Sequence, residues 1–363
     1  MTTQPHRVIQ WSTGNVGRLA LRGIINHPGL ELVGLLVHSD AKAGLDAGEL
    51  CGVGPTGVLA TTDIDAILAM DADCVSYTAT GDLRPSEAVD DMCRILESGK
   101  NVVATSVVPL VYPPHARTTM PGVVEQLEAA CAEGGTSCFT SGIDPGFAND
   151  ILPIFLMGVS ERVDSVRIQE ILNYDTYDQP EVLFGTMGFG QPMDAMPLIL
   201  FPTALTLAWG PVVAMIADSL QLELDEITEW HEKWEAPVRY ETAVGPIEAG
   251  TMAGLRFEVR GMVGGEERIV VEHVTRMHND VAPEWPHGTN PQGGYRITIE
   301  GSPTIKVDLE IVGADGDHND GGLVVTAMRI LNAIPAVCAA EPGVLSSLDL
   351  PVISGALLAS HWG

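Results

Sequence analysis

Side chains that can carry protons gather in one short stretch of the sequence, residues 170–178. Glu170 offers a carboxylate, and Tyr174 and Tyr177 offer phenol groups. Carboxylates and phenols act as general acids and bases when a protein places them beside a reacting group. We expect Glu170 and Tyr174 to be catalytic and Tyr177 to contact a substrate. The alternative is a polar surface loop, in which residues of these types are common.

A histidine in a later strand is the second acid–base candidate. His273 lies in an alternating stretch, residues 271–276, so it shares one face of the predicted strand with Val271. Because Val271 is expected to face inward, His273 is expected to face inward as well. It is then either a catalytic residue, since imidazole titrates near neutral pH, or a hydrogen-bonded residue of the core.

A turn near the start of the chain has the spacing of a phosphate-binding loop. An apolar run at residues 8–11 leads into Ser-Thr-Gly-Asn-Val-Gly at residues 12–17, and an apolar helical stripe follows. Gly14 is expected to let the backbone turn without a Cβ clash, and Gly17 to let the helix pack close to a sheet. The first helical turn can then hold a diphosphate, through the candidates Thr13, Gly14, Asn15, Val16 and Gly17. Ser12 replaces the first glycine of the usual dinucleotide pattern, so a purely structural turn is the alternative.

The end of the next predicted strand, residues 32–37, indicates which dinucleotide binds. NAD enzymes usually place Asp or Glu there to bind the ribose 2′-hydroxyl, whereas this chain has His38, Ser39 and Lys42. A lysine and a hydroxyl group can bind a 2′-phosphate. We therefore expect NADP as the cofactor, with NAD as the alternative because Asp40 lies in the same loop.

Three further predicted strands end in small polar residues, at residues 78–82, 105–106 and 141–147. Ligands bind beyond the carboxyl ends of parallel strands, so these ends are expected to line a cofactor cleft, although such residues are also ordinary in turns. The cofactor-binding candidates among them are Thr78, Ala79, Thr80 and Ser106. Asp144 is expected either to contact substrate or nicotinamide, or to stabilise its Pro-Gly turn. Asn332, in a later segment, is expected to bind the nicotinamide amide or to cap a helix.

Two kinds of domain are needed to position these candidates. Predicted strands at residues 73–79, 101–105 and 137–140 alternate with helices, which predicts an α/β domain with a parallel sheet covered on both faces. After residue 147 the pattern changes to strands with alternating burial. They are expected at residues 163–171, 236–241, 255–263, 268–277, 294–300 and 305–311.

These patterns give an expected domain organisation. We expect a Rossmann dinucleotide-binding domain over residues 1–147. An α+β substrate and dimerisation domain with an open mixed or antiparallel sheet is expected over residues 148–326. A C-terminal helix and tail, residues 327–363, is expected to pack back on the Rossmann domain.

Composition limits the classes of partner. The net charge of −29 and the lack of a basic patch argue against nucleic acid. Residues 195–217 are uncharged but contain three prolines, so we expect a buried helix there and no membrane partner. Neither a signal peptide nor a Cys-x-x-Cys pair is evident, and we expect a cytoplasmic location. The acidic loop at residues 315–326 lacks the glycine and glutamate of a calcium loop, and we expect no metal site.

Three segments together resemble a known family. Residues 11–17, residues 141–147, and residues 332–337 followed by Glu-Pro-Gly at 341–343 resemble dihydrodipicolinate-reductase-like proteins. The combination is most similar to the branch of 2,4-diaminopentanoate dehydrogenase and the native amine dehydrogenases. The resemblance implies reversible, NAD(P)H-linked interconversion of an amine with a ketone or aldehyde plus ammonia. It also implies a Rossmann domain, an α+β substrate domain and a homodimer.

The chain departs from that branch at one position. The amine dehydrogenases of the branch resemble one another in having a glutamate shortly after the fourth strand, whereas residues 105–112 contain no carboxylate. Either another acid handles the ammonia, or the substrate is not an amine. Two alternatives therefore accompany the expected amine dehydrogenase: a carbonyl or imine reductase, and a non-catalytic NADP-binding sensor.

Overall fold

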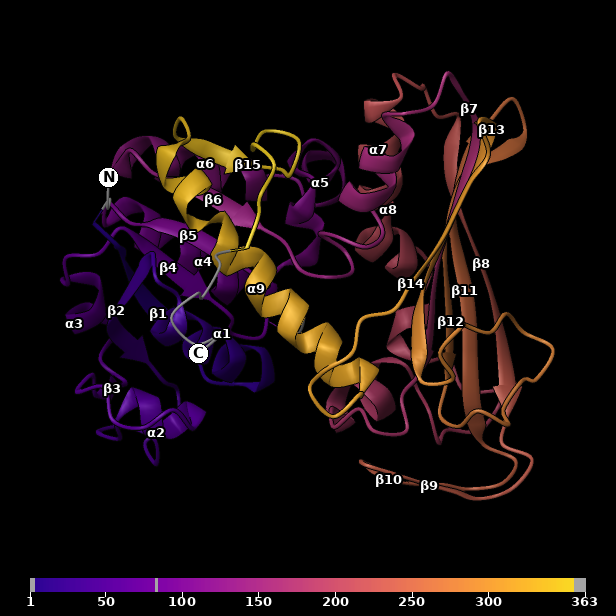
Figure 1. Cartoon of the computed structure of the whole chain (residues 1–363), viewed down its shortest axis with the longest axis horizontal. Helices are drawn as coiled ribbons and strands as arrows, with labels where there is room; N and C mark the ends of the chain where they lie inside the picture. The colour runs from indigo at the N-terminus through magenta and orange to yellow at the C-terminus, as the bar shows by residue number, and fades with distance from the viewer. Residues whose placement is uncertain (1–3, 82–83, 356–363) are drawn as a thin grey trace, which may run out of the picture. The chain divides into compact units, whose positions relative to one another are not determined.

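The computed structural model describes residues 4–81 and 84–355, and the chain divides into two compact units (Figure 1). The first unit holds the residues up to Gly146 together with those from Leu323 onward. The second unit runs from Phe147 to Gly322. Each unit is described by itself below.

The first unit is built on a seven-stranded sheet in the order β15-β6-β5-β4-β1-β2-β3, in which every pair is parallel. Its strands are β1 (His6–Trp11), β2 (Leu30–Leu36), β3 (Ala60–Thr61), β4 (Cys74–Tyr77), β5 (Asn101–Ala104), β6 (Ser137–Thr140) and β15 (Gly343–Leu345). The central strands are continuous buried runs, as expected when both faces of a parallel sheet are covered. The predicted parallel α/β sheet is confirmed.

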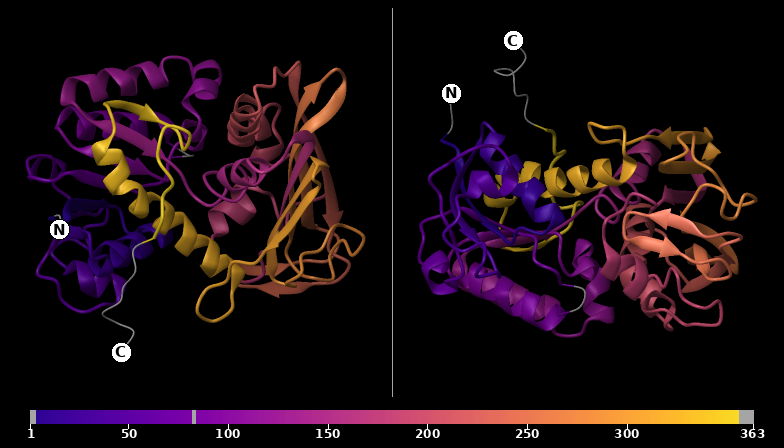
Figure 2. Two further views of the ribbon diagram at one scale, coloured as in Figure 1. Left: turned by 45° about the horizontal axis from the view of Figure 1, so that its top comes forward. Right: turned by 90° about the horizontal axis from the view of Figure 1, so that it is seen from below.

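Helices cover both faces of this sheet (Figures 1 and 2). One face, with Val8 and Phe139, packs against α1 (Asn15–Asn26) and the later part of α9 (His318–Ala339). The other face, with Trp11 and Tyr77, packs against α3 (Ile64–Leu68), α4 (Pro85–Glu97) and α6 (Val123–Gly134). Shorter elements complete the unit: α2 (Ala47–Cys51), η1 (Val108–Val111) and α5 (Pro113–Thr119).

Helix α9 is long and apolar enough, by length and composition, to cross a membrane. Its residues Ala327, Ile330, Leu331 and Ile334 are nevertheless fully buried in the core beneath the first sheet. The helix begins nine residues before the predicted start at residue 327, at His318. Core packing therefore accounts for its apolar composition.

The turn between β1 and α1 differs in detail from the prediction. Gly14 has φ −69°, which any residue can adopt, and a Cβ there would meet nothing within 4 Å. The predicted role of Gly14 in avoiding a Cβ clash is therefore wrong. Ser12 takes the left-handed conformation instead, with φ 82°. The predicted close packing at Gly17 is confirmed, because a Cβ there would lie 2.5 Å from the Ser12 carbonyl oxygen and 2.6 Å from Thr78 Oγ1.

The second unit is built on a six-stranded sheet in the order β14-β13-β7-β12-β11-β8. Its strands are β7 (Arg162–Asn173), β8 (Glu226–Glu235), β11 (Met252–Val263), β12 (Glu266–Arg276), β13 (Gly293–Ser302) and β14 (Ile305–Leu309). Only β12 and β7 pair in parallel, and the other neighbours are antiparallel. The predicted open mixed sheet is confirmed.

Helix α8 (Ala204–Ser219) packs on one face of this sheet, against β8, β11 and β12. It begins inside the uncharged stretch 195–217, ends two residues beyond it, and is largely buried, as predicted. No helix of the described second unit covers the other face (Figure 1). The remaining elements are α7 (Ile151–Met157), η2 (Glu181–Thr186), η3 (Leu198–Leu200) and the hairpin of β9 (Tyr240–Thr242) and β10 (Gly245–Ile247).

One strand of the second sheet, β8, was not predicted from the sequence. The stretch predicted as a strand at residues 236–241 contains only the start of the short β9, whereas β8 lies ten residues earlier, at Glu226–Glu235. This edge strand reads EITEWHEKWE and buries none of its residues fully. An edge strand rich in charge has no alternating apolar pattern, which is the signal that predicts strands from sequence.

The packing at Gly17 predicts a matched pair of substitutions. Gly17→Ala should lower the melting temperature, because the new methyl group meets a backbone oxygen that cannot move freely, and such overpacking costs ~1–3 kcal/mol. Gly14→Ala, where there is open space, should leave the melting temperature of the cofactor-free protein unchanged. Thermal denaturation monitored by circular dichroism compares the two variants. Equal melting temperatures for both would contradict the close approach at Gly17.

Candidate functional site

The amino-terminal end of α1 is suited to an anion. Its N-cap, Gly14, provides no side chain to cap the first turn, and that turn holds no acidic residue. The amides of a first helical turn need hydrogen-bond acceptors, and a diphosphate supplies them. The open space above Gly14 leaves room for that group. Thr13, Gly14, Asn15 and Val16 thus lie where the sequence predicted a phosphate contact.

Gln10 supports this turn through side-chain hydrogen bonds, a role that sequence reasoning missed. Its amide is buried at the end of β1 and donates to the Ser12 carbonyl oxygen at 2.9 Å and to Thr78 Oγ1 at 2.8 Å. Thr78 in turn donates to the Trp11 carbonyl oxygen at 3.0 Å. These contacts fix the left-handed Ser12 against the end of β4.

Lys42 connects the loop after β2 to the phosphate turn. Its Nζ donates to the Thr13 carbonyl oxygen at 3.2 Å and to Thr13 Oγ1 at 3.0 Å. His38 and Ser39 lie at the start of the same loop and are exposed. The structure therefore brings three predicted cofactor residues to one edge of the sheet.

Arg84 is a further cation at this edge that sequence reasoning missed. Burial and then the charge of Arg84 lower the pKa of His38, so Arg84 lies within electrostatic reach of that imidazole. Arg84 Nε also donates to the carbonyl oxygen of Thr80, at 3.1 Å. No pattern marked it in advance, because it stands in the loop before α4 as an isolated arginine.

The remaining strand ends are held together by short-range contacts. Ser106 is buried after β5 and its hydroxyl donates to the Ala79 carbonyl oxygen. After β6, the Gly146 carbonyl oxygen accepts hydrogen bonds from Ser141 Oγ and Arg329 Nε, both at 3.1 Å. Asp144 is half-buried within that loop.

Asn332 does not lie at the strand ends that hold the other cofactor-binding candidates. It hydrogen-bonds His27, the residue that ends α1, and lines a pocket of about 360 Å³ between α1 and α9. The phosphate turn is at the opposite end of α1, roughly 17 Å away along a twelve-residue helix. This location does not favour the predicted nicotinamide contact.

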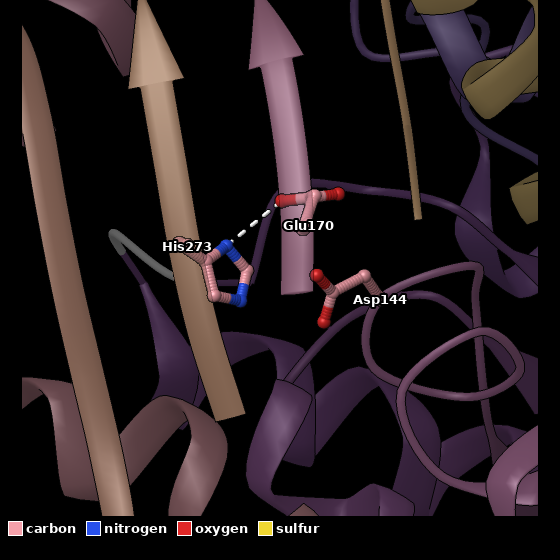
Figure 3. Close-up of side chains that lie close together, drawn as sticks. All are labelled: Asp144, Glu170 and His273. Atoms are coloured by element: carbon pink, nitrogen blue, oxygen red, sulfur yellow. Dashed lines mark ion pairs between the residues drawn. The ribbon is translucent and has the colours of Figure 1, made fainter. Parts of the chain in front are cut away.

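In the second unit, Glu170 and His273 form an ion pair. Glu170 lies on β7 and His273 directly opposite on β12, and His273 Nδ1 is 2.8 Å from Glu170 Oε2 (Figure 3). Their side chains point toward each other, and the residues are only 7% and 3% exposed. Glu170 is therefore a buried strand residue, and the alternative of a polar surface loop does not apply to it.

Tyr295 extends this pair into a row across three strands. It stands opposite Glu170 on β13, and its hydroxyl donates to Glu170 Oε1 at 2.6 Å. The two carboxylate oxygens thus meet different partners, the imidazole on one side and the phenol on the other. Hydrogen bonds of this kind favour the charged form of a buried carboxylate.

Two aromatic rings pack against His273. The ring of Phe257 stacks on the imidazole at 4.6 Å between centroids, and the ring of Trp209 on α8 lies at 4.5 Å. Trp209 and Phe257 also contact each other, with centroids 4.8 Å apart, so the three rings form one packed cluster that restricts the imidazole. His273 meets the prediction that it shares the inward face with Val271, which is fully buried.

Tyr174 and Tyr177 follow β7 and stack on each other, with ring centroids 4.8 Å apart. Burial and the charge of Glu170 raise the pKa of Tyr177 to about 12. Tyr177 therefore stays protonated at neutral pH and faces the field of Glu170. The structure brings together Glu170, His273 and Tyr177, which the sequence named as separate candidates, and adds Tyr295, Phe257 and Trp209.

Comparison with known proteins identifies the relatives of each part. Residues 147–361 match the profile of the 2,4-diaminopentanoate dehydrogenase C-terminal domain, and residues 8–105 match the dihydrodipicolinate reductase N-terminus. An amine dehydrogenase of Streptomyces virginiae is 43% identical over 95% of this chain and 96% of its own length. The 2,4-diaminopentanoate dehydrogenase of Acetoanaerobium sticklandii is 26% identical over 73% of this chain and 70% of its own.

A solved structure supports the fold over almost the whole chain. The amine dehydrogenase from Mycobacterium smegmatis superposes with a TM-score of 0.76 at 21% identity, covering 96% of this chain and 97% of that one. The family profile spans more than half of the chain, and the relative from Streptomyces virginiae spans nearly all of it. The chain therefore belongs to the 2,4-diaminopentanoate dehydrogenase branch of the dihydrodipicolinate-reductase-like family and is an NAD(P)-dependent oxidoreductase.

Proposed function

We propose that this enzyme is an amine dehydrogenase, which converts a small ketone or aldehyde and ammonia into an amine and also catalyses the reverse oxidative deamination. The buried Glu170 carboxylate, held by His273 and Tyr295, carries this proposal. Its relatives support it, since two of them are named for amine substrates. The bound cofactor would supply or accept the hydride.

Glu170 would do the work of the glutamate that this chain lacks after β5. When ammonia adds to a carbonyl carbon, the nitrogen must lose a proton and the departing oxygen must gain two before water leaves. A carboxylate beside a titratable imidazole can take up and return such protons. We assign Glu170 as the acid–base group and His273 as its proton-exchanging neighbour.

The other site residues would orient the substrate. Tyr177 stays protonated at neutral pH and can donate to a carbonyl or carbinol oxygen. Tyr174, stacked beside it, would contribute a second phenol. Asp144, in the loop after β6, would be a further substrate contact.

We further propose NADP as the preferred cofactor. Thr13, Gly14, Asn15, Val16 and Gly17 would hold its diphosphate, and Thr78, Ala79, Thr80 and Ser106 would line the path toward the nicotinamide. Lys42 and Arg84 would bind the 2′-phosphate beside His38 and Ser39. A positive charge in the loop after β2 favours the 2′-phosphate of NADP, whereas NAD enzymes usually place a carboxylate in that loop to bind the ribose 2′-hydroxyl.

The activity is tested by following NADPH consumption with a panel of small ketones and aldehydes, with and without ammonium. Consumption that requires ammonium supports an amine dehydrogenase. Consumption without ammonium points instead to a carbonyl reductase. Tight NADPH binding with no consumption on any carbonyl would favour a cofactor-binding sensor.

Replacing Glu170 tests the proposed acid–base group. Glu170→Gln keeps the size and the hydrogen-bond acceptor but cannot exchange protons, so kcat for reductive amination should fall by ~100-fold or more. The dissociation constant for NADPH, measured by fluorescence, should stay the same. Glu300→Gln, an exposed residue on β13, is the matched control. Full activity in Glu170→Gln would remove Glu170 from the mechanism.

Lys42 tests the cofactor preference. Lys42→Ala removes a positive charge beside the ribose position, so NADP binding should weaken about tenfold while NAD binding changes little. Titration calorimetry with both cofactors measures the difference. Lys306→Ala, an exposed lysine on β14, should alter neither affinity. If Lys42→Ala weakened both cofactors equally, the 2′-phosphate assignment would be wrong.

We also propose that two copies associate through the uncovered face of the second sheet. On this face Arg167, Arg256 and Arg260 form ion pairs with Glu258, Glu267 and Glu272. These pairs neutralise one another although the chain carries a net charge of −29. Copies that repel each other elsewhere can therefore meet here. Trp230 lies among these groups, with Arg256 and Arg260 over its ring.

The six cysteines are free thiols, which suits the proposed cytoplasmic location.

Trp230 tests this association. Wild-type protein should sediment as a dimer in analytical ultracentrifugation. Trp230→Asp should sediment as a monomer, because it replaces a ring between two arginines with a charge that would be desolvated at the interface. Leu59→Asp, at an exposed position of the first unit, should leave the dimer intact. A monomeric wild type, or a dimeric Trp230→Asp, would contradict the proposal.

A further inference from the structure

We infer that Tyr295 is a positioning residue that holds the Glu170 carboxylate in its working orientation and in its charged form. This inference rests on the proposed function, in which Glu170 exchanges protons with the substrate. No pattern singled out Tyr295, which alternates with Ile297 and Ile299 in the strand predicted at residues 294–300.

Strand register gives Tyr295 this role. β7 lies between β12 and β13, and Glu170 is paired with His273 on one side and with Tyr295 on the other. Residues directly opposite on neighbouring strands share a face of the sheet, so their side chains meet without any loop rearrangement. The contact is therefore set by backbone hydrogen bonding, which makes it rigid.

The hydrogen bond between Tyr295 and Glu170 is short and shielded from solvent. Tyr295 is 3% exposed, and its hydroxyl oxygen is 2.6 Å from Glu170 Oε1. A phenol that donates to a carboxylate forms a charge-assisted hydrogen bond, which is stronger than a neutral one. Because the phenol proton is directed at Glu170, we assign Tyr295 a role through Glu170 and not on the substrate.

The loss of this hydroxyl has two expected consequences. First, the carboxylate would keep only the His273 contact in the row and could rotate about its side-chain torsions, which lowers the fraction of enzyme with Glu170 correctly placed. Second, the charged form would lose a donor, so Glu170 would take up a proton at a higher pH than before.

The other titratable groups of the second unit near this row do not replace Tyr295. His273 already contacts the opposite carboxylate oxygen. Tyr177 is held in its protonated form by burial and by the charge of Glu170, which raises its pKa to about 12. His318 lies beside the Tyr295 ring, with centroids 5.9 Å apart, and burial lowers its pKa, so it is uncharged near neutral pH.

Tyr295→Phe tests the inference in steady-state kinetics of reductive amination. We expect kcat to fall about tenfold, as for the loss of one hydrogen bond to a charged group. The KM for the ketone and the dissociation constant for NADPH should stay within twofold. The acidic limb of the pH–kcat profile should move to higher pH by roughly one unit.

Two controls separate positioning from general damage. Tyr240→Phe removes a hydroxyl from a tyrosine of the same unit that stacks on His278, and it should leave kcat and the pH profile unchanged. In a Glu170→Gln background, Tyr295→Phe should have no further effect on the residual rate, because a residue that acts through Glu170 has nothing left to position.

The outcomes are distinct. If Tyr295→Phe keeps the wild-type kcat and pH profile, or lowers the rate equally in the Glu170→Gln background, the inference is overturned while the amine dehydrogenase proposal stands. If wild-type protein forms no amine at all, the proposed function fails first. Circular dichroism and the melting temperature verify that each variant is folded.

Discussion

Burying a carboxylate is the constraint on which the second unit depends. An ionised carboxylate away from water costs several kcal/mol unless charged or hydrogen-bonding partners compensate. Glu170 is 7% exposed and finds two partners from the strands on either side, His273 and Tyr295. The parallel pairing of β12 with β7 and the antiparallel pairing of β13 with β7 together make this row possible. A shift of one residue in either register would move one partner to the other face of the sheet and leave the carboxylate without it.

The first unit meets a related requirement with backbone groups. Its candidate anion site at the start of α1 has no side-chain cap, and the turn before the helix is kept in place by the left-handed Ser12 and by Gln10. The Ser12 carbonyl oxygen lies so close to Gly17 that a methyl group at Gly17 would clash with it. Positive charge lies at the edge of the sheet, on Lys42 and on Arg84, which also pairs with Asp91. The proposed phosphate site would thus depend first on backbone geometry and second on charge.

Most of the fold could be predicted from the sequence, because the alternation of strands and helices and the period of apolar residues can be recognised without knowing any tertiary contact. Sequence reasoning missed β8, a charged edge strand without an apolar pattern. It also expected Gly14 to avoid a Cβ clash, whereas the structure leaves open space at Gly14 and gives the left-handed conformation to Ser12. For the candidate site, residue types and strand alternation singled out Glu170 and His273, which the structure places in contact. Tyr295, Trp209 and Phe257 could not be predicted, because their roles come from strand register and helix packing between distant segments. Asn332 is a motif residue that the fold places at the far end of α1, beside His27.

The central claim is that the hydride goes to a carbon that has first exchanged oxygen for nitrogen. The most direct measurement runs the reaction with ¹⁵N-ammonium and NADPH deuterated at C4, on the transferred face, and analyses the product by mass spectrometry. The account predicts an amine that carries both ¹⁵N and one deuterium in the same molecule. An alcohol that carries deuterium without ¹⁵N would contradict it, because the enzyme would then reduce the carbonyl directly.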